Sequence, residues 1–231
     1  MLTRRAPWRD RDLEDKDRKG VPDEYNRDTP FAVSGAIGQT METVNPVTLP
    51  EHYEKHLGQI ARGWSNEKRM HGIQVVSFER QPEPGVKTYA TLGLSRHIVE
   101  LPHSKEIRQE LLLSANDSFP SASVAGLVLS LAEHVLRRGR ALLRGEVVGP
   151  TTPVISGSAL TAIYVTNPSP FSDSLSEYKC EYPPIVFAYL IPITTLESAL
   201  IRKKGWNWFE EQLEEQNPDI WDLMRSDGIF E

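Results

Sequence analysis

The sequence contains little cysteine and no long apolar run. Its single cysteine, Cys180, excludes an intrachain disulfide and is typical of a reducing compartment. The longest apolar stretch, residues 185–193, has nine residues, about half of the roughly 20 that a helix needs to cross a bilayer. The N-terminus lacks the apolar core of about 7 to 15 residues that a signal peptide requires. We therefore expect a cytoplasmic protein with no membrane partner, in which residues 185–193 form a buried strand.

A basic charge balance is also absent, and the acidic charge is concentrated at one end. The net charge is −6, and residues 205–231 carry one basic and eight acidic side chains. Proteins bind nucleic acid without sequence preference by neutralising phosphates with lysine and arginine, so an acidic end argues against that class of partner. Clustered carboxylates instead favour association with a basic surface. We expect a protein partner with a basic surface and no direct contact with nucleic acid; the sequence leaves the oligomeric state open.

Length and composition indicate one ordinary globular domain behind a charged leader. Hydrophobic residues make up 39% and charged residues 25% of the 231 positions, and a domain near this size buries roughly 70% of the surface of its unfolded chain. Residues 1–45 combine prolines with charges of both signs and show no periodic apolar face, which predicts a disordered leader. The alternative that translation starts at Met41 stays open. The folded domain is predicted over residues 46–231.

Apolar periodicity predicts one helix and three strands in the first half of this domain. Apolar side chains at helical spacing predict a short helix over residues 50–63. Residues 73–78 and 87–94 are predicted to be strands that pair as a hairpin across a loop rich in proline and glycine. Residues 106–114 alternate apolar and charged side chains, with Glu110 on the charged face. We therefore expect one face of this third strand to lie in water.

The second half opens with the clearest helix of the chain. Residues 120–138 carry one continuous apolar stripe. Ser121 or Ser123 is expected to cap the start of this helix, and Gly139 is expected to end it in the left-handed conformation. A strand is predicted over residues 159–166.

The C-terminal segment combines a strand end with the signals of two helices. Pro192 falls at the end of the apolar strand, where the loss of an amide donor is tolerated. Thr194 and Glu197 form a capping box that predicts the start of a helix. Gly205 is expected to end this helix, and Asn207 is expected to cap a second one.

Taken together, the motifs of residues 185–225 resemble the C-terminal signature of the suppressor of fused family. The shared features are a buried strand that ends in Ile-Pro-hydroxyl, a Glu three residues into a helix, Lys-Gly, a second helix and Asp-x-x-Arg. The last motif is Asp222 to Arg225, whose spacing predicts a local salt bridge on one helical face. The GLS of residues 93–95 and the segment RQELLLSA support the likeness over residues 55–225. The resemblance implies a single mixed α/β domain with a central mixed sheet flanked by helices.

The resemblance also implies a protein-binding function without catalysis. Short bacterial members of the family occur among immunity proteins, so the chain is predicted to be an immunity protein or antitoxin that neutralises a cognate toxin by binding it. Animal members sequester zinc-finger transcription factors in Hedgehog signalling. A second prediction therefore stays open, namely a regulatory scaffold that sequesters a transcription factor or signalling protein. An enzyme with an unrecognised site is the third alternative.

The candidate partner-binding surface lies in and before the second C-terminal helix. Aromatic side chains anchor interfaces, and carboxylates attract basic partners. The two tryptophans of this helix and Phe209 cannot all point the same way, so we expect at least one of the three at the surface. The candidate residues are Trp206, Trp208, Glu210, Glu211, Glu214, Glu215 and the loop residue Tyr182.

Catalytic and metal-binding signatures are absent. His97, Glu100 and His103 lack the spacing of a zinc-binding helix, and a proline interrupts them, which favours solvated loop residues. No protease signature surrounds Cys180, which is predicted to be an ordinary free thiol. We expect no catalytic residue, no metal site and no cofactor.

Overall fold

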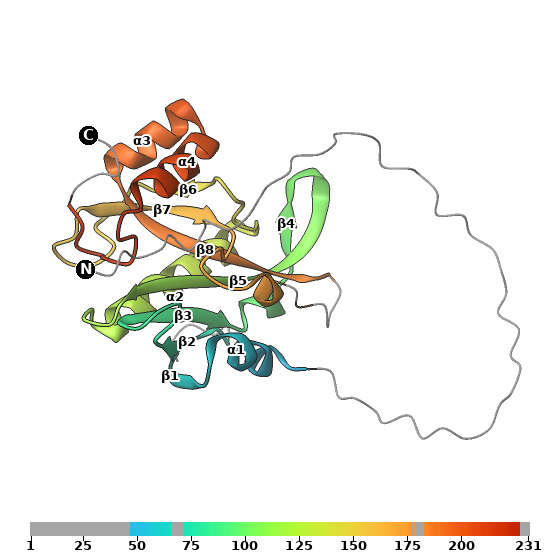
Figure 1. Cartoon of the computed structure of the whole chain (residues 1–231). Coiled ribbons are helices and arrows are strands. Elements are labelled where there is room, and N and C mark those ends of the chain that lie inside the picture. The colour runs from blue at the N-terminus through green and yellow to red at the C-terminus, as the bar shows by residue number, and fades with distance from the viewer. Residues whose placement is uncertain (1–46, 66–71, 177, 179–182, 227–231) are drawn as a thin grey trace, which may run out of the picture.

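The computed structural model describes residues 47–65, 72–176, 178 and 183–226, so the predicted leader, residues 1–45, lies outside it. The described chain forms one eight-stranded sheet with helices on both faces (Figure 1). In chain order the elements are α1 (Leu49–Leu57), β1 (Ile60–Ser65), β2 (Gln74–Glu79), β3 (Val86–Leu92), η1 (Leu94–Arg96), β4 (Val99–Leu101), η2 (Pro102–Ser104), β5 (Lys105–Asn116), α2 (Ser121–Arg138), β6 (Val147–Val148), β7 (Leu160–Thr166), η3 (Asp173–Ser176), β8 (Ile185–Thr194), α3 (Thr195–Lys204) and α4 (Trp206–Gln216).

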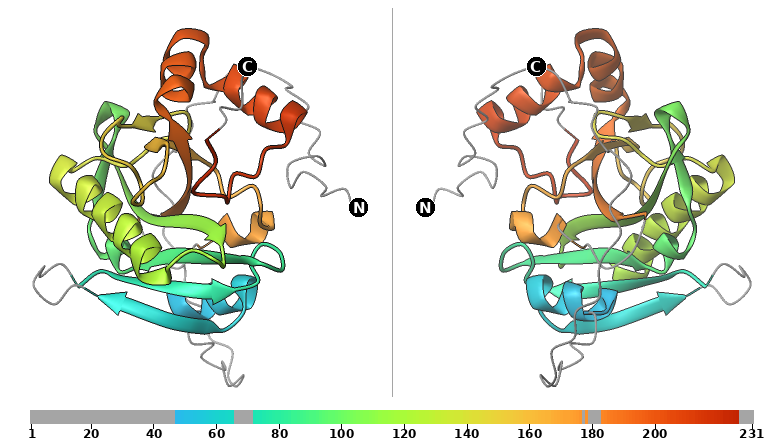
Figure 2. Two further views of the ribbon diagram at one scale, coloured as in Figure 1. Left: turned by 90° about the vertical axis from the view of Figure 1, so that its left-hand side faces the viewer. Right: turned by 90° about the vertical axis from the view of Figure 1, so that its right-hand side faces the viewer.

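The sheet is mixed and has a parallel pair at its centre. Its strands follow the order β1-β2-β3-β5-β8-β7-β6, with β4 paired to β5 outside this path. β5 and β8 run parallel, with Arg108 opposite Ile185, and the other pairs, including the predicted β2–β3 hairpin, are antiparallel. Helix α2 covers one face, and α1, α3 and α4 cover the other (Figure 2). The predicted mixed α/β fold, a central sheet flanked by helices, is confirmed.

From Gln109 to Ala115, strand β5 is buried on both faces, which corrects the expectation for residues 106–114. Leu111 and Leu113 pack with α2, whereas Leu112 belongs to the core on the opposite face. Glu110, which was expected to lie in water, is 0% exposed. The reason is topological: β5 lies between β3 and β8 in a sheet covered by helices on both sides, and such interior strands have no solvated face.

Helix α1 is shorter than predicted. It ends at Leu57, because Gly58 adopts a φ of 82°, a conformation that favours glycine. Ile60, which was assigned to the helix, begins β1 and lies opposite Phe78 of β2. The predicted helix over residues 50–63 is therefore wrong beyond Leu57.

Helix α2 agrees with the prediction except at its first residue. Gly139 ends it with a left-handed φ of 67°. The expected serine cap is wrong, because Pro120 is the N-cap and no side chain caps this end. The Ser121 hydroxyl instead accepts a hydrogen bond from the Tyr89 hydroxyl at 3.0 Å. This contact joins the start of α2 to β3.

Candidate functional site

Helix α4 is positioned by the local sequence that precedes it. The predicted capping box is confirmed, since the Glu197 N–H donates to the Thr194 hydroxyl at 3.1 Å and the Thr194 N–H donates to the Glu197 carboxylate at 2.6 Å. Gly205, with a φ of 92°, ends α3 and is also the N-cap of α4. Helix α4 therefore begins at Trp206, and the expectation that Asn207 would cap it is wrong.

The aromatic side chains at the start of α4 divide between core and surface. Phe209 is fully buried in the core beneath the helix. Trp206 is 36% exposed, and the Arg144 guanidinium lies 4.7 Å from the centre of its ring. Trp208 is half-buried, and the Lys204 ammonium lies 4.0 Å from the centre of its ring. Such cation–π contacts restrain both tryptophans, and the expectation that at least one aromatic lies at the surface is confirmed.

Glu210 is half-buried, and groups of the same chain bind its carboxylate. The hydroxyls of Tyr164 and Thr166 donate hydrogen bonds to it at 2.7 and 2.8 Å. Arg144 forms a two-point ion pair with it, with Nε at 3.2 Å. The hydrogen bond to Glu210 raises the pKa of Arg144, and burial together with the Glu210 charge raises the pKa of Tyr164. Glu210 thereby joins α4 to β7 and to the loop before β6.

No local motif could have identified these partners of Glu210. Tyr164, Thr166 and Arg144 lie 46, 44 and 66 residues away from it in the chain. Only the pairing of β7 with β8 and the packing of α4 on this part of the sheet bring them together.

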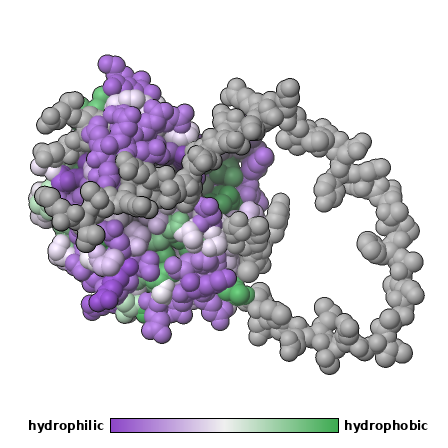
Figure 3. All heavy atoms as spheres, viewed as in Figure 1, coloured by the Kyte–Doolittle hydropathy of each residue, from purple (hydrophilic) through white to green (hydrophobic). Residues whose placement is uncertain are grey.

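Three other carboxylates of α4 face the solvent. Glu211, Glu214 and Glu215 are exposed, and the Gln212 side chain donates a hydrogen bond to Glu215 at 3.0 Å. Figure 3 shows mainly hydrophilic side chains at the top of the molecule, where Figure 1 places α3 and α4. We call Glu211, Glu214 and Glu215 the acidic face of α4. Tyr182, the remaining candidate, lies outside the described residues.

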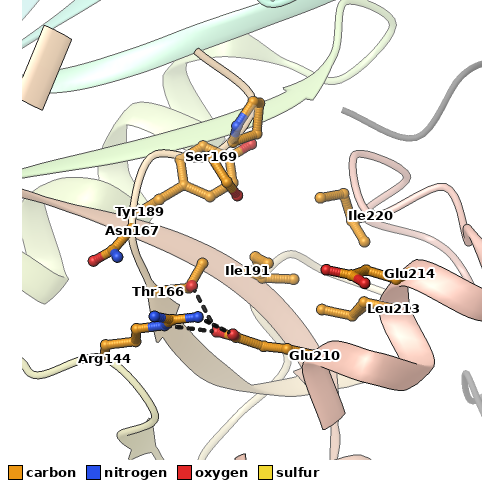
Figure 4. Close-up of a pocket in the computed structure, with 11 residues that line it drawn as sticks. Arg144, Thr166, Asn167, Ser169, Tyr189, Ile191, Glu210, Leu213, Glu214 and Ile220 are labelled. Carbon is orange, nitrogen blue, oxygen red and sulfur yellow. Dashed lines mark hydrogen bonds and ion pairs between the residues drawn. The ribbon is translucent and has the colours of Figure 1, made fainter. Parts of the chain in front are cut away.

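A pocket of about 140 Å³ opens beside the acidic face (Figure 4). Its lining combines polar and apolar residues, and among the apolar ones Ile191, Leu213 and Ile220 are each at most 4% exposed. The ion pair of Arg144 with Glu210 forms part of the wall. The lining residues are Arg144, Thr166, Asn167, Ser169, Pro170, Tyr189, Ile191, Glu210, Leu213, Glu214 and Ile220.

Three residues of the C-terminal signature, Pro192, Glu197 and Arg225, meet in the core. Arg225 donates to the two carboxylate oxygens of Glu197 at 2.7 and 3.0 Å, and to the Pro192 carbonyl at 2.9 Å. The predicted local salt bridge between Asp222 and Arg225 is wrong, because residues 217–226 form no helix and the Asp222 carboxylate accepts a backbone N–H two residues on. The signature therefore describes a buried ion pair that joins the C-terminal segment to the start of α3.

The two other segments that carry the resemblance also lie together. Glu110, within RQELLLSA, accepts hydrogen bonds from the N–H groups of Gly93 and Ser95, both at 3.0 Å, and from the Thr91 hydroxyl. Burial raises the pKa of Glu110, although these hydrogen bonds act in the opposite direction. The carboxylate thus fixes the turn that follows β3, which is a structural role.

Within residues 47–65, 72–176, 178 and 183–226, no group of three or more His, Cys, Asp and Glu side chains could hold a metal ion. Glu100 and His103 are exposed, and His97 is half-exposed. Cys180 lies outside the described residues. None of the helices that the structure describes is long and apolar enough to cross a membrane.

Comparison with known proteins identifies relatives that cover most of the chain. Residues 69–226 match the family model described as Suppressor of fused protein (SUFU). The Immunity protein YqcF of Bacillus subtilis is 20% identical over 173 residues, which cover 74% of this chain and 88% of the relative. A solved SUFU homolog from Neisseria gonorrhoeae has a TM-score of 0.61 at 18% identity, covering 79% of this chain and 93% of that chain. A chain of the Sufu–Fu complex crystal structure has a TM-score of 0.60 at 12% identity, and the match covers 79% of this chain and 89% of that chain.

Proposed function

Since the chain belongs to the suppressor of fused family, we propose that it is a non-enzymatic protein-binding module that acts as an immunity protein. It binds the folded domain of a cognate bacterial toxin in the cytoplasm and neutralises it by occupancy. The similarity to an immunity protein over 74% of this chain supports the proposal. No catalytic step is needed for this action.

The observation that carries the proposal is the acidic face of α4. Its three carboxylates are exposed. Phe209 and Leu213 on the same helix are at most 4% exposed, and they anchor α4 to the core. A fixed row of like charges steers a partner of opposite charge and accelerates association. The partner surface is therefore basic, as in a toxin that acts on nucleic acid, whose phosphates the carboxylates would replace.

The tryptophans beside the acidic face supply contact area. Trp206 and Trp208 are held by cations of the same chain, so they lose little conformational freedom when a partner packs on them. Tryptophan is enriched among the residues that dominate binding energy. Tyr182 remains part of the proposed surface as an expectation from the sequence. Glu210 contributes indirectly, because it holds Arg144 against Trp206.

The first experiment is recovery of the partner. The protein, tagged at one end, is purified from its native host at moderate salt, and mass spectrometry identifies any protein that co-purifies in stoichiometric amount. One toxin domain with a basic surface is the expected result. A toxin whose contact surface is acidic would contradict the role of the acidic face.

The second experiment reverses the acidic face. The triple variant Glu211→Lys, Glu214→Lys and Glu215→Lys is expected to associate with the recovered partner about tenfold more slowly or worse, and to protect less well. The matched control changes the net charge equally at exposed positions remote in sequence, with Glu100→Lys, Glu106→Lys and Asp117→Lys. Equal association rates for the two triple variants would refute the proposed surface. Glu210 stays unchanged in both, since its loss would break internal contacts.

A regulatory scaffold is the second candidate function. The family match and the similarity to the chain solved as the Sufu–Fu complex favour it. Co-purification of a transcription factor or signalling protein, instead of a toxin, would support this alternative.

A further inference from the structure

The pocket beside the acidic face has an interior suited to one apolar side chain. Ile191, Leu213 and Ile220 line it and are almost completely buried. The volume of about 140 Å³ matches that of an apolar cavity, about 150 Å³, known to bind benzene. One aromatic ring or one branched aliphatic side chain therefore fits.

The charge at the pocket favours a cation beside that apolar group. Arg144 is the only basic residue among the described lining residues, and the Glu210 carboxylate already neutralises it. Glu214 also lines the pocket, and Figure 4 shows its carboxylate pointing toward the space above Leu213. Glu211 and Glu215 add negative charge on the same helix. A ligand with a positive charge next to its apolar part is attracted, and an anion is repelled.

The pocket is also held in shape before any ligand arrives. The contacts of Glu210 with Tyr164, Thr166 and Arg144 connect the helix on one side of the pocket to β7 and to the loop before β6. Leu213 is 4% exposed and anchors the same helix. Little conformational freedom remains to be lost on binding, which favours affinity.

We propose that this pocket receives one aromatic or branched aliphatic side chain of the protein partner, with a neighbouring Lys or Arg of that partner paired to Glu214. The inference rests on the proposed function, because it places the partner on α4. It adds the chemistry of the anchoring residue: an apolar side chain adjacent to a cation.

Three small probes test this chemistry without knowledge of the partner. Benzylamine combines an aromatic ring with a cation, benzyl alcohol is its neutral counterpart, and phenylacetate carries a negative charge. Each is titrated into the full-length protein while the methyl NMR signals of Ile191, Leu213 and Ile220 are followed. We expect saturable shifts of all three signals, with benzylamine binding about fivefold more tightly than benzyl alcohol, the factor for unit charges about 4 Å apart in water. Phenylacetate should bind most weakly.

Substitutions locate the site and the charge. Glu214→Gln should abolish the preference for benzylamine, whereas Glu211→Gln, on the same helix but outside the lining, should preserve most of it. Leu213→Phe should fill the pocket and weaken all probes at least tenfold. If Leu213→Phe does not fold, Ser169→Leu at the half-buried rim serves the same purpose. Unshifted methyl signals, or phenylacetate bound as tightly as benzylamine, would overturn the proposal.

Failure of the anchor can be told apart from failure of the proposed function. If Leu213→Phe leaves the affinity for the recovered partner unchanged while reversal of the acidic face slows association, the pocket is not the anchor and the binding surface stands. If reversal of the acidic face has no effect on partner binding, the proposed surface fails whatever the probes show.

Discussion

Replacement of Arg225 by alanine tests whether one buried ion pair holds the C-terminal segment against the sheet. The side chains of Arg225 and Glu197 are 8% and 0% exposed. The guanidinium contacts both carboxylate oxygens at 2.7 and 3.0 Å and the Pro192 carbonyl at 2.9 Å. Arg225→Ala therefore removes the cation that faces a fully buried carboxylate, and it removes the donor to a buried carbonyl.

The expected loss of stability is large because the remaining charge stays out of water. Removing one partner of a buried ion pair costs about 3–5 kcal/mol, a large part of the roughly 5–15 kcal/mol by which a domain is stable. With a urea dependence of about 2 kcal/mol per M, the unfolding midpoint should fall by about 1.5–2.5 M. Urea unfolding followed by circular dichroism measures it. Arg225→Lys keeps the charge but not the two-point contact, so its loss should be smaller.

The matched control is an arginine in a more exposed pair. Arg138 pairs with Glu146, and their side chains are 34% and 21% exposed. Pairs near the surface contribute about 0–1 kcal/mol, so Arg138→Ala should barely move the midpoint. A loss for Arg225→Ala no larger than that of this control would refute the argument that burial makes the pair indispensable.

Two further substitutions test the buried carboxylate of β5 and the turn under Trp206. Burial holds the pKa of Glu110 above its ordinary value of 4.5 in the folded protein. The folded state therefore favours the protonated carboxyl, and this contribution to stability is full below pH 4.5 and is lost as pH rises through the raised pKa. Glu110→Gln should therefore gain stability relative to wild type as pH rises above 4.5 in urea unfolding, with Glu106→Gln at an exposed position of the same strand as the control. In Gly145→Ala, the new Cβ would lie 2.6 Å from the Trp206 ring, at a backbone φ of 86°. The control is Gly85→Ala, which has a similar φ of 88° but open space around the new Cβ. Both alanine variants should lose about 1–3 kcal/mol, but only Gly145→Ala should shift the Trp206 indole signal in NMR spectra; an unmoved signal would contradict the close contact.

Sequence patterns predicted several features whose determinants lie within one or two helical turns. The capping box of Thr194 and Glu197 and the left-handed cap at Gly139 are confirmed, because these signals use hydrogen bonds and backbone preferences of adjacent residues. The apolar run of β8 is confirmed as a strand, because a strand that is buried on both faces of a covered sheet has a nearly continuous apolar sequence.

Two local predictions are wrong, the serine cap of α2 and the Asn207 cap of α4, and the other wrong predictions concern pairing over longer distances. The alternation in residues 106–114 indicated a solvated face, but alternation does not reveal how many layers cover a strand. Ile60 fitted both the helical spacing and a strand, and pairing with Phe78 of β2 decided for the strand. Arg225 was assigned to Asp222, three residues away, yet it binds Glu197, 28 residues away, because the C-terminal segment returns to the start of α3.

The sequence by itself determined the family, the mixed α/β fold and the acidic character of the C-terminal end. Charge and local conformational preference belong to each residue and its near neighbours, so they can be read along the chain. Only the tertiary structure decided which carboxylates of α4 are available to a partner. Glu210 is bound by Arg144 from a distant loop, while Glu211, Glu214 and Glu215 face the solvent. Availability depends on which remote groups the fold brings within hydrogen-bonding distance, and no pattern within one helix contains that information.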